Sequence, residues 1–228
     1  MSRPRGMTLI ELMVYAMLLS VALATIFLFF KYGNVYLHKT RTMVAVEQQS
    51  NVATAWLMKD LMECPEGLID SFASPPGVVF LSARDNNGNF VYDTNTGDPI
   101  WQRYVGYYLD VDPERPNDTR VNALFRAEQV VGGLPATNAQ RPTPAGVTTT
   151  TMRTSGINRR LVAHGLVPPT GGNHGGLDVY SLPDPAQPAN KQYDALFNPL
   201  YLDLEFRNTS AGSSESSIQT RLRIQARS

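Results

Sequence analysis

The apolar and polar positions first predict one long helix. Residues 12–30 form an uncharged run of 19 residues, close to the roughly 20 needed to cross a bilayer as a helix. In residues 31–63 apolar side chains recur at steps of three and four, which is typical of an amphipathic helix. The recurring positions are Met43, Val46, Ala53, Trp56, Leu57 and Leu61. Because 31–63 contains no proline and only one glycine, and Pro65 follows it, we expect one continuous helix from about residue 8 to residue 63.

After Pro65 the period of the apolar pattern changes to two, which indicates β-strands. The strand candidates are residues 78–83, 101–109, 123–126, 161–166, 177–182, 200–207 and 218–226, with 90–92 as a possible hairpin partner of the first. The last two alternate most regularly, and we expect them to pair. Asp203 and Glu205 would then face Arg221 and Arg223, each pair contributing about 0.2–1 kcal/mol. A solvated face with such stabilising pairs is favoured over a basic patch that binds a partner.

The order of elements predicts an α+β fold in which the long helix packs on an antiparallel sheet. We assign residues 7–31 to a membrane half of the helix, 32–64 to an amphipathic half and 65–228 to a β-rich head. Residues 132–152 are rich in Gly, Pro, Thr and Ala without an apolar period, so they predict a long exposed loop. Trp56 is expected to anchor the helix on the sheet, and stacking on a ligand is the less favoured alternative.

Composition limits the class of protein. A chain of 228 residues accommodates one membrane helix and one globular domain. Lys plus Arg equals Asp plus Glu at 20 each, which is unlike the basic composition of general nucleic-acid binders. Cys64 is the only cysteine, so an intramolecular disulfide is excluded, and it is interpreted as a packed small residue.

The N-terminal junction differs from a secretory signal peptide, in which the cleavage site follows the apolar core. Here a short leader with Arg3 and Arg5 ends at Gly6, before the apolar run. Cleavage after Gly6 would remove residues 1–6 and leave the apolar segment on the mature protein. It would also create a free amino group on Met7, four residues from the carboxylate of Glu11.

Glu11 is costly near a lipid-spanning helix, at roughly 2.5–3.5 kcal/mol if it lies deep. Carboxylates in that position usually have a partner or a function, and an unpaired charge in apolar surroundings is strongly disfavoured. The freed amino group of Met7, in the same chain or in a neighbouring one, would be a natural partner. The alternative is that Glu11 lies in the headgroup layer near a helix start, where the helix dipole favours it.

The stretch Gly6-Met7-Thr8-Leu9-Ile10-Glu11 resembles the processing and methylation signal of type IV prepilins and type II secretion pseudopilins. The resemblance implies a pilin-like fold, cleavage by a prepilin peptidase after Gly6 and N-methylation of Met7. It also implies that Glu11 is the assembly carboxylate, which sets the axial register between neighbouring subunits. Met7 stands where phenylalanine is commoner in the family, and Tyr15 interrupts an otherwise small and aliphatic run.

The order of elements also resembles PilW-type minor pilins and J-type pseudopilins. The shared features are a Phe-Leu-Ser-Ala-Arg strand at 80–84, a Trp-Gln-x-Tyr stretch at 101–104 and an Arg-x-Arg final strand at 221–223. The membrane half lacks the proline typical of major pilins, which favours a minor subunit.

These features predict a minor type IV pilin that primes or caps a pilus used in twitching motility, adhesion or DNA uptake. Before assembly it would lie in inner-membrane lipid with a cytoplasmic N-terminus and a periplasmic head, and later on the cell surface, packed with other major and minor pilins. Arg3 and Arg5 favour this orientation, whereas Lys31, His38, Lys39 and Arg41 oppose it, and the family pattern decides it. The alternatives are a minor pseudopilin of a type II secretion system and a single-pass anchored periplasmic binding module or enzyme.

No catalytic constellation is evident, so we expect a structural protein without a cofactor. His38, His164 and His174 lack the spacing of a zinc site, and no phosphate-binding loop or Gly-x-Ser-x-Gly elbow occurs. His174 is placed in a flexible glycine-rich loop.

Two further clusters are candidate binding sites. Calcium at Asp85, Asn87, Asn89 and Asp93 is less favoured than a hairpin turn, because the bidentate glutamate is missing and Gly88 is misplaced. Arg153, Arg159 and Arg160 could contact DNA phosphates at a pilus tip. A plain surface charge cluster is the favoured interpretation.

Overall fold

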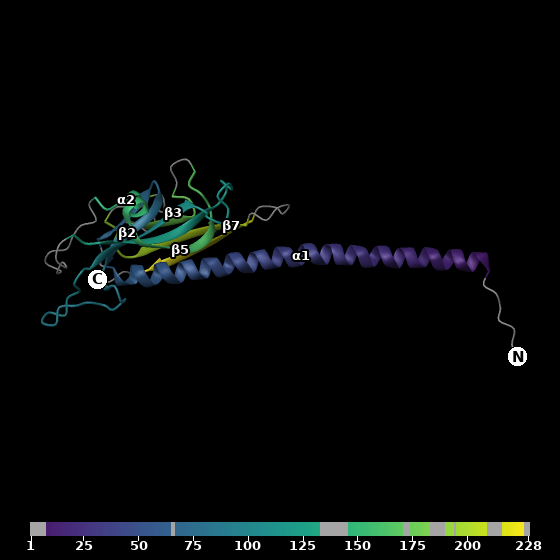
Figure 1. The fold of residues 1–228 in the computed structure, drawn as a ribbon, viewed down its shortest axis with the longest axis horizontal. Helices are drawn as coiled ribbons and strands as arrows, with labels where there is room; N and C mark the ends of the chain where they lie inside the picture. The colour runs from purple at the N-terminus through teal and green to yellow at the C-terminus, as the bar shows by residue number, and fades with distance from the viewer. Residues whose placement is uncertain are drawn as a thin grey trace. The chain divides into compact units, whose positions relative to one another are not determined.

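The computed structural model describes residues 8–64, 67–132, 146–170, 174–182, 190–193, 195–208 and 216–225. The chain divides into two compact units, Met1–Val44 and Ala45–Ser228. The first unit contributes only helix to the described residues, and the second contains the sheet. The expectation of an α+β, pilin-like arrangement is confirmed: the chain has a long N-terminal helix, and the part of this helix from Ala45 onward packs against a curled antiparallel sheet (Figure 1).

Helix α1 (Leu9–Glu63) matches the expected span within one residue at its start. It begins after Thr8, which provides a side-chain cap, and it ends before Cys64. No proline interrupts it, and Gly33 is its only glycine. From Ala45 onward, one side of α1 is buried against the sheet through Ala53, Leu57 and Leu61. These residues recur at steps of four, as the sequence pattern predicted.

The sheet has eight strands: β1 (Ile69–Ala73), β2 (Pro76–Ser82), β3 (Arg103–Val111), β4 (Asn122–Val130), β5 (Ile157–Leu166), β6 (Leu177–Ser181), β7 (Leu200–Asn208) and β8 (Ser216–Ile224). From β1 to β5 each strand is antiparallel to the next, and β7 pairs with the end of β5, with β6 and with β8. Gln192 bonds to Ser181 of β6, while Tyr193 and Leu196 bond to β1. These bonds link β6 back to β1 and curl the sheet.

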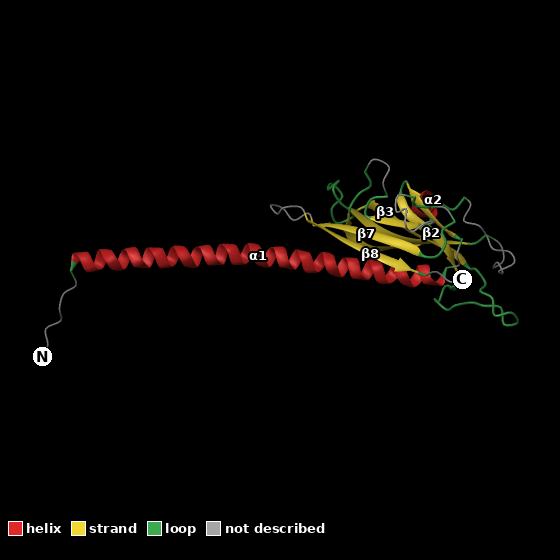
Figure 2. Ribbon diagram, turned by 180° about the vertical axis from the view of Figure 1, so that it is seen from behind, coloured by secondary structure: helices red, strands yellow, loops and turns green. Residues whose placement is uncertain are grey.

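The two faces of the sheet carry separate apolar clusters. Phe80, Tyr107 and Leu124 point toward α1, whereas Leu81, Tyr108 and Phe125 belong to the cluster on the opposite face. Neighbouring residues of a strand point to opposite faces. Because both faces are covered, every residue of β2 is buried. Figures 1 and 2 show α1 and α2 on opposite sides of the strands of this unit.

Helix α2 (Thr149–Ser155) is a correction to the predicted exposed loop 132–152. Residues 133–145 lie outside the described residues, but Thr149 and Met152 are fully buried. A capping box formed by Thr148 and Thr151 starts this helix. The loop prediction fails here because the burial comes from strands distant in sequence, not from an apolar period within the segment.

Other predicted strands are correct in place and wrong in extent. β4 and β5 are longer than 123–126 and 161–166, and β1 was not predicted. The 90–92 segment forms only isolated bridges, Arg84 with Phe90 and Tyr92 with Pro99, so it is not a full hairpin strand.

The pairing of β7 with β8 is confirmed, and so is the bridge between Asp203 and Arg221, with N–O distances of 2.7 and 2.8 Å. The second expected charge pair is wrong. Glu205 lies opposite Gln219, and Arg223 lies opposite Tyr201, because the register sets these two charges four positions apart along the ladder.

Candidate functional site

The start of α1 is organised by a reciprocal cap between Thr8 and Glu11. The backbone N–H of Thr8 donates to Oε2 of Glu11 over 2.8 Å, and its hydroxyl donates to the same oxygen over 3.0 Å. In return, the backbone N–H of Glu11 donates to Oγ1 of Thr8 over 3.3 Å. This is a capping box, which satisfies N–H groups that a helix start leaves without an intrahelical partner. The sequence interpretation missed Thr8, although the Thr-x-x-Glu spacing is a readable signal.

Glu11 therefore has two oxygens in different situations. Both bonds from Thr8 end on Oε2, and within the described residues Oε1 accepts no hydrogen bond. Gly6 and Met7, the expected cleavage and methylation residues, lie outside the described residues. Glu11 is exposed, so one oxygen can cap its own helix while the other remains open to a cation.

Apolar side chains cover the first unit on all sides. From Leu9 to Leu37, every large hydrophobic residue is exposed, and Phe29 is 77% exposed. α1 is the one helix of the described residues whose length and composition would allow it to cross a membrane. An apolar surface of this extent is typical of a segment that contacts lipid or other helices.

Trp56 lies at the edge of the core, where it is half-buried against the helix-side cluster. The guanidinium of Arg160, from β5, stacks over its ring at 4.3 Å from the centroid, and that of Arg126, from β4, lies at 6.0 Å. Trp56 thus contacts the sheet through two cations. The fully buried contact of α1 comes from Leu57 and Leu61.

Beside Trp56, α1 and the sheet are joined by a buried charge pair that sequence analysis did not identify. Asp60 is 8% exposed, and its Oδ2 accepts bonds of 2.8 Å from both the hydroxyl of Tyr107 and Nε of Arg126. Burial raises the pKa of the Tyr107 hydroxyl, so it remains a donor. The partners are 47 and 66 residues from Asp60, and no local pattern connects them.

Arg126 extends this contact along β4 to Glu128, which also pairs with Arg103 of β3 and accepts a 2.9 Å bond from Asn158 of β5. Burial alone would raise the pKa of Glu128, but the bonds from Asn158 and Arg126 outweigh burial and hold that pKa below its usual value. The cleft of about 440 Å³ at this place is lined by these same groups. Because Asp60, Arg103, Arg126 and Glu128 are already paired with one another, this part of the cleft fixes α1 on the sheet.

The Asp85–Asn89 segment is a turn organised by one carboxylate. Oδ1 of Asp85 accepts the backbone N–H groups of Asn87 and Asn89, each over 2.8 Å. These bonds lower the pKa of Asp85. They occupy the oxygen that a calcium site would need, and among the described residues no group of three or more His, Cys, Asp or Glu could hold a metal ion.

The predicted arginine cluster is divided between the two faces of the sheet. Arg159 lies over the ring of Phe125 at 4.2 Å, on the α2 side, whereas Arg160 lies over Trp56 on the α1 side. Arg153 and Arg159 both pair with Asp110, at 3.2 and 3.0 Å. The three residues therefore do not form one basic patch, which weakens the suggested contact with DNA phosphates.

The three histidines lie in different surroundings. His38 is exposed on α1, and Nδ1 of His164 lies 2.8 Å from a buried carboxylate, that of Asp112. The placement of His174 in a flexible loop is wrong, because it is buried and stacked on Tyr193 at 4.1 Å between ring centroids. The expectation for Cys64 is confirmed, since its side chain is fully buried.

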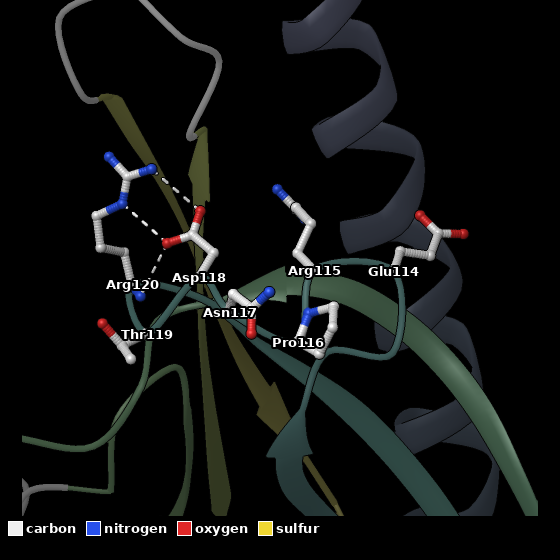
Figure 3. A pocket seen from close by; sticks show the side chains of 7 residues that line it. All are labelled: Glu114, Arg115, Pro116, Asn117, Asp118, Thr119 and Arg120. Atoms are coloured by element: carbon white, nitrogen blue, oxygen red, sulfur yellow. Dashed lines mark hydrogen bonds and ion pairs between the residues drawn. The ribbon is translucent and has the colours of Figure 1, made fainter.

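The connection between β3 and β4 forms an open hollow of about 590 Å³ lined by residues 114–120 (Figure 3). Asp118 pairs with Arg120 across it, at 2.9 and 3.1 Å, and these bonds lower the pKa of Asp118. The buried carboxylate of Asp112 accepts a 3.0 Å bond from the backbone of Glu114 and fixes the start of the loop. The hollow is polar, and three of its lining charges have ion-pair partners, Arg115 with Asp112 and Asp118 with Arg120.

Comparison with known families gives one result for this chain. Residues 1–27 match the family model described as the prokaryotic N-terminal methylation motif. Comparison with curated proteins and with solved structures gave no match. The matched segment contains the Gly6–Met7 junction and Glu11, and it leads into the apolar helix. The N-terminal segment therefore carries the methylation motif that prepilins and pseudopilins share, as the sequence resemblance implied.

Proposed function

We propose that this protein is a minor type IV pilin, a structural subunit that primes or caps a pilus filament and has no enzymatic activity. The observation that carries the proposal is the methylation motif placed directly on an exposed apolar helix. A single cysteine and a membrane half without proline distinguish the chain from typical major subunits. Both features favour a minor role.

The precursor is held in the inner membrane by the apolar half of α1, with the N-terminus in the cytoplasm and the head in the periplasm. Prepilin peptidase cuts between Gly6 and Met7, and the new N-terminal residue is methylated. Removal of residues 1–6 takes away Arg3 and Arg5 and leaves a helix that can move from lipid into a bundle of similar helices. The other pilins are its partners in that bundle.

Assembly depends on Glu11 in this account. The exposed apolar side chains of α1 give attraction between helices but little information on their axial alignment. A carboxylate in apolar surroundings is disfavoured unless it is paired. When Oε1 of Glu11 meets the terminal amine of Met7 in a neighbouring subunit, only one axial register satisfies both charges, while Oε2 continues to cap its own helix.

The test separates pairing from capping with three variants. Glu11→Gln keeps an oxygen for the capping box but loses the charge, whereas Thr8→Ala loses the hydroxyl of the cap but keeps the charge. Filaments are counted by electron microscopy, and insertion is checked by membrane fractionation. We expect Glu11→Gln and Glu11→Ala to insert normally and to reduce filament number strongly, and Thr8→Ala to assemble. Loss of filaments in Thr8→Ala alone would assign Glu11 a capping role only.

The alternative subunit type is a minor pseudopilin of a type II secretion system, which the same motif supports equally. A deletion strain distinguishes the two functions, since loss of twitching or DNA uptake indicates a pilus and loss of exoprotein secretion indicates the secretion machine. An anchored periplasmic binding module would retain residues 1–6 and would tolerate Glu11→Gln.

A further inference from the structure

Three cations on α1 follow the apolar run and have no ion-pair partner within the described residues. Lys31, Lys39 and Arg41 are all exposed. In the head, by contrast, three arginines close to α1, Arg84, Arg103 and Arg126, each pair with a carboxylate. Like charges at neighbouring positions on one helix repel each other slightly. An anionic partner bound to this group of cations would offset that repulsion.

The sequence around these cations contains no internal counter-charge. Residues 12–46 include no Asp or Glu, so Lys31, Lys39 and Arg41 give this part of the chain three positive charges, and His38 lies between Lys31 and Lys39. On a helix, acids three or four positions away would be the normal neutralising partners. Here the nearest acids, Glu11 and Glu47, are 20 residues before Lys31 and six after Arg41.

The same stretch presents aromatic and aliphatic side chains. Tyr32, Tyr36 and Val35 are 69%, 72% and 62% exposed. At about 100° per residue, Lys31, Val35 and Lys39 lie along one side of the helix, with Tyr32 and Tyr36 beside them. Lys31 directly follows the apolar run, and Lys39 lies about 12 Å further along the axis. Amphipathic rings mixed with long cationic side chains are typical of the membrane–water interface.

We propose that Lys31, Lys39 and Arg41 bind the phosphate groups of anionic phospholipids in the leaflet nearer the head, while Tyr32 and Tyr36 lie at the headgroup level. The inference rests on the proposed membrane insertion of α1. The lipid would hold the unassembled subunit at a fixed depth, and transfer into a filament would require its release. A lipid partner is favoured over an acidic protein because the cations begin at the end of the bilayer-length apolar run, where headgroups must lie.

The test uses the purified, uncleaved full-length chain in detergent, so it does not depend on processing or assembly. Phosphatidylglycerol and phosphatidylcholine with identical acyl chains are titrated in competition, and native mass spectrometry measures the bound lipid. The variant Lys31→Gln/Lys39→Gln/Arg41→Gln is compared with the control Lys59→Gln/Arg153→Gln/Arg223→Gln, which removes three exposed charges from the second unit. Far-UV circular dichroism checks that both variants remain folded.

We expect the wild type and the control to prefer phosphatidylglycerol. The Lys31→Gln/Lys39→Gln/Arg41→Gln variant should lose that preference by about tenfold or more, since each cation near an anionic surface contributes roughly fivefold. Equal binding of the two lipids by the wild type overturns the proposal. The proposal also fails if the Lys31→Gln/Lys39→Gln/Arg41→Gln variant keeps the preference. If that same variant also loses cross-linking to other pilins, the three cations bind an acidic protein surface instead of lipid. None of these results depends on whether Glu11→Gln blocks filaments, so the inference and the proposed function can fail separately.

Discussion

The hydroxyl of Tyr107, in the middle of β3, donates a 2.8 Å hydrogen bond to Oδ2 of Asp60 on α1. Arg126 of β4 donates to the same oxygen, so one carboxylate joins the helix to two adjacent strands. The site is nearly closed to solvent, with the Arg126 side chain 12% exposed. A pair in this position fixes the rotation of α1 about its axis more strictly than the apolar contacts of Leu57 and Leu61 can.

Removal of the Asp60 carboxylate should be much more damaging than removal of the Tyr107 hydroxyl. Asp60→Ala leaves the guanidinium of Arg126 buried without this partner, and a loss of about 3–5 kcal/mol in the free energy of unfolding is expected. Tyr107→Phe removes one hydrogen bond and should cost about 1 kcal/mol. Urea unfolding of the full chain in detergent, followed by tryptophan fluorescence, measures both, because Trp56 and Trp101 are in the second unit. Equal losses would show that the ion pair does not dominate this contact.

The fit of α2 on the sheet depends on Gly106. A Cβ at this position would lie 2.6 Å from Cγ of Met152, which is fully buried. Gly106→Ala should therefore destabilise the head by about 1–3 kcal/mol through overpacking. Met152→Ala alone should cost about 2–5 kcal/mol by leaving a cavity.

The double variant Gly106→Ala/Met152→Ala tests the contact itself. The smaller side chain at 152 gives room for the new methyl group, so the combined loss should be clearly less than the sum of the two single losses. If the losses in the free energy of unfolding were additive in the same urea measurement, the two positions would not be in steric contact.

These contacts show which parts of the fold the sequence could predict. Local patterns were enough for α1, with its unbroken apolar period and its terminal breaker, and for β7 and β8, with strict alternation. They were not enough for α2, whose Thr149 and Met152 are buried only because glycines of β2 and β3 let them approach. The Asp60–Arg126 pair was missed for the same reason, since its partners are 66 residues apart and meet only after folding.

At the N-terminus the signal is a short linear stretch, and the methylation motif read from the sequence is confirmed over residues 1–27. The roles of Gly6, Met7 and Glu11 in cleavage, methylation and assembly stay predictions. The role of Thr8 as the cap partner of Glu11 needed the geometry of the helix start.

Stability of the head should depend on pH through His174. Burial lowers the pKa of this imidazole below its ordinary 6.5, opposed by Asp178 at 3.9 Å and assisted by Lys191. As the pH falls through 6.5, the unfolded chain therefore takes up a proton before the folded chain does. Full stability is expected above pH 6.5, with a progressive loss below it toward the folded pKa.

The variant His174→Phe checks this dependence. It keeps a ring to stack on Tyr193 but cannot take up a proton. Thermal unfolding midpoints between pH 7.5 and pH 5.5 should fall for the wild type and change less for the variant. Parallel curves for the two proteins would exclude His174 as the source of the slope.

The central claim is that this chain is a prepilin whose leader is removed to create the assembly end. Intact-mass and N-terminal analysis of protein extracted from native membranes tests it directly, with Gly6→Leu as an uncleaved control. The account predicts a chain that begins at Met7 and carries one added methyl group, while the control retains residues 1–6. Fully functional protein that still begins at Met1 would contradict it.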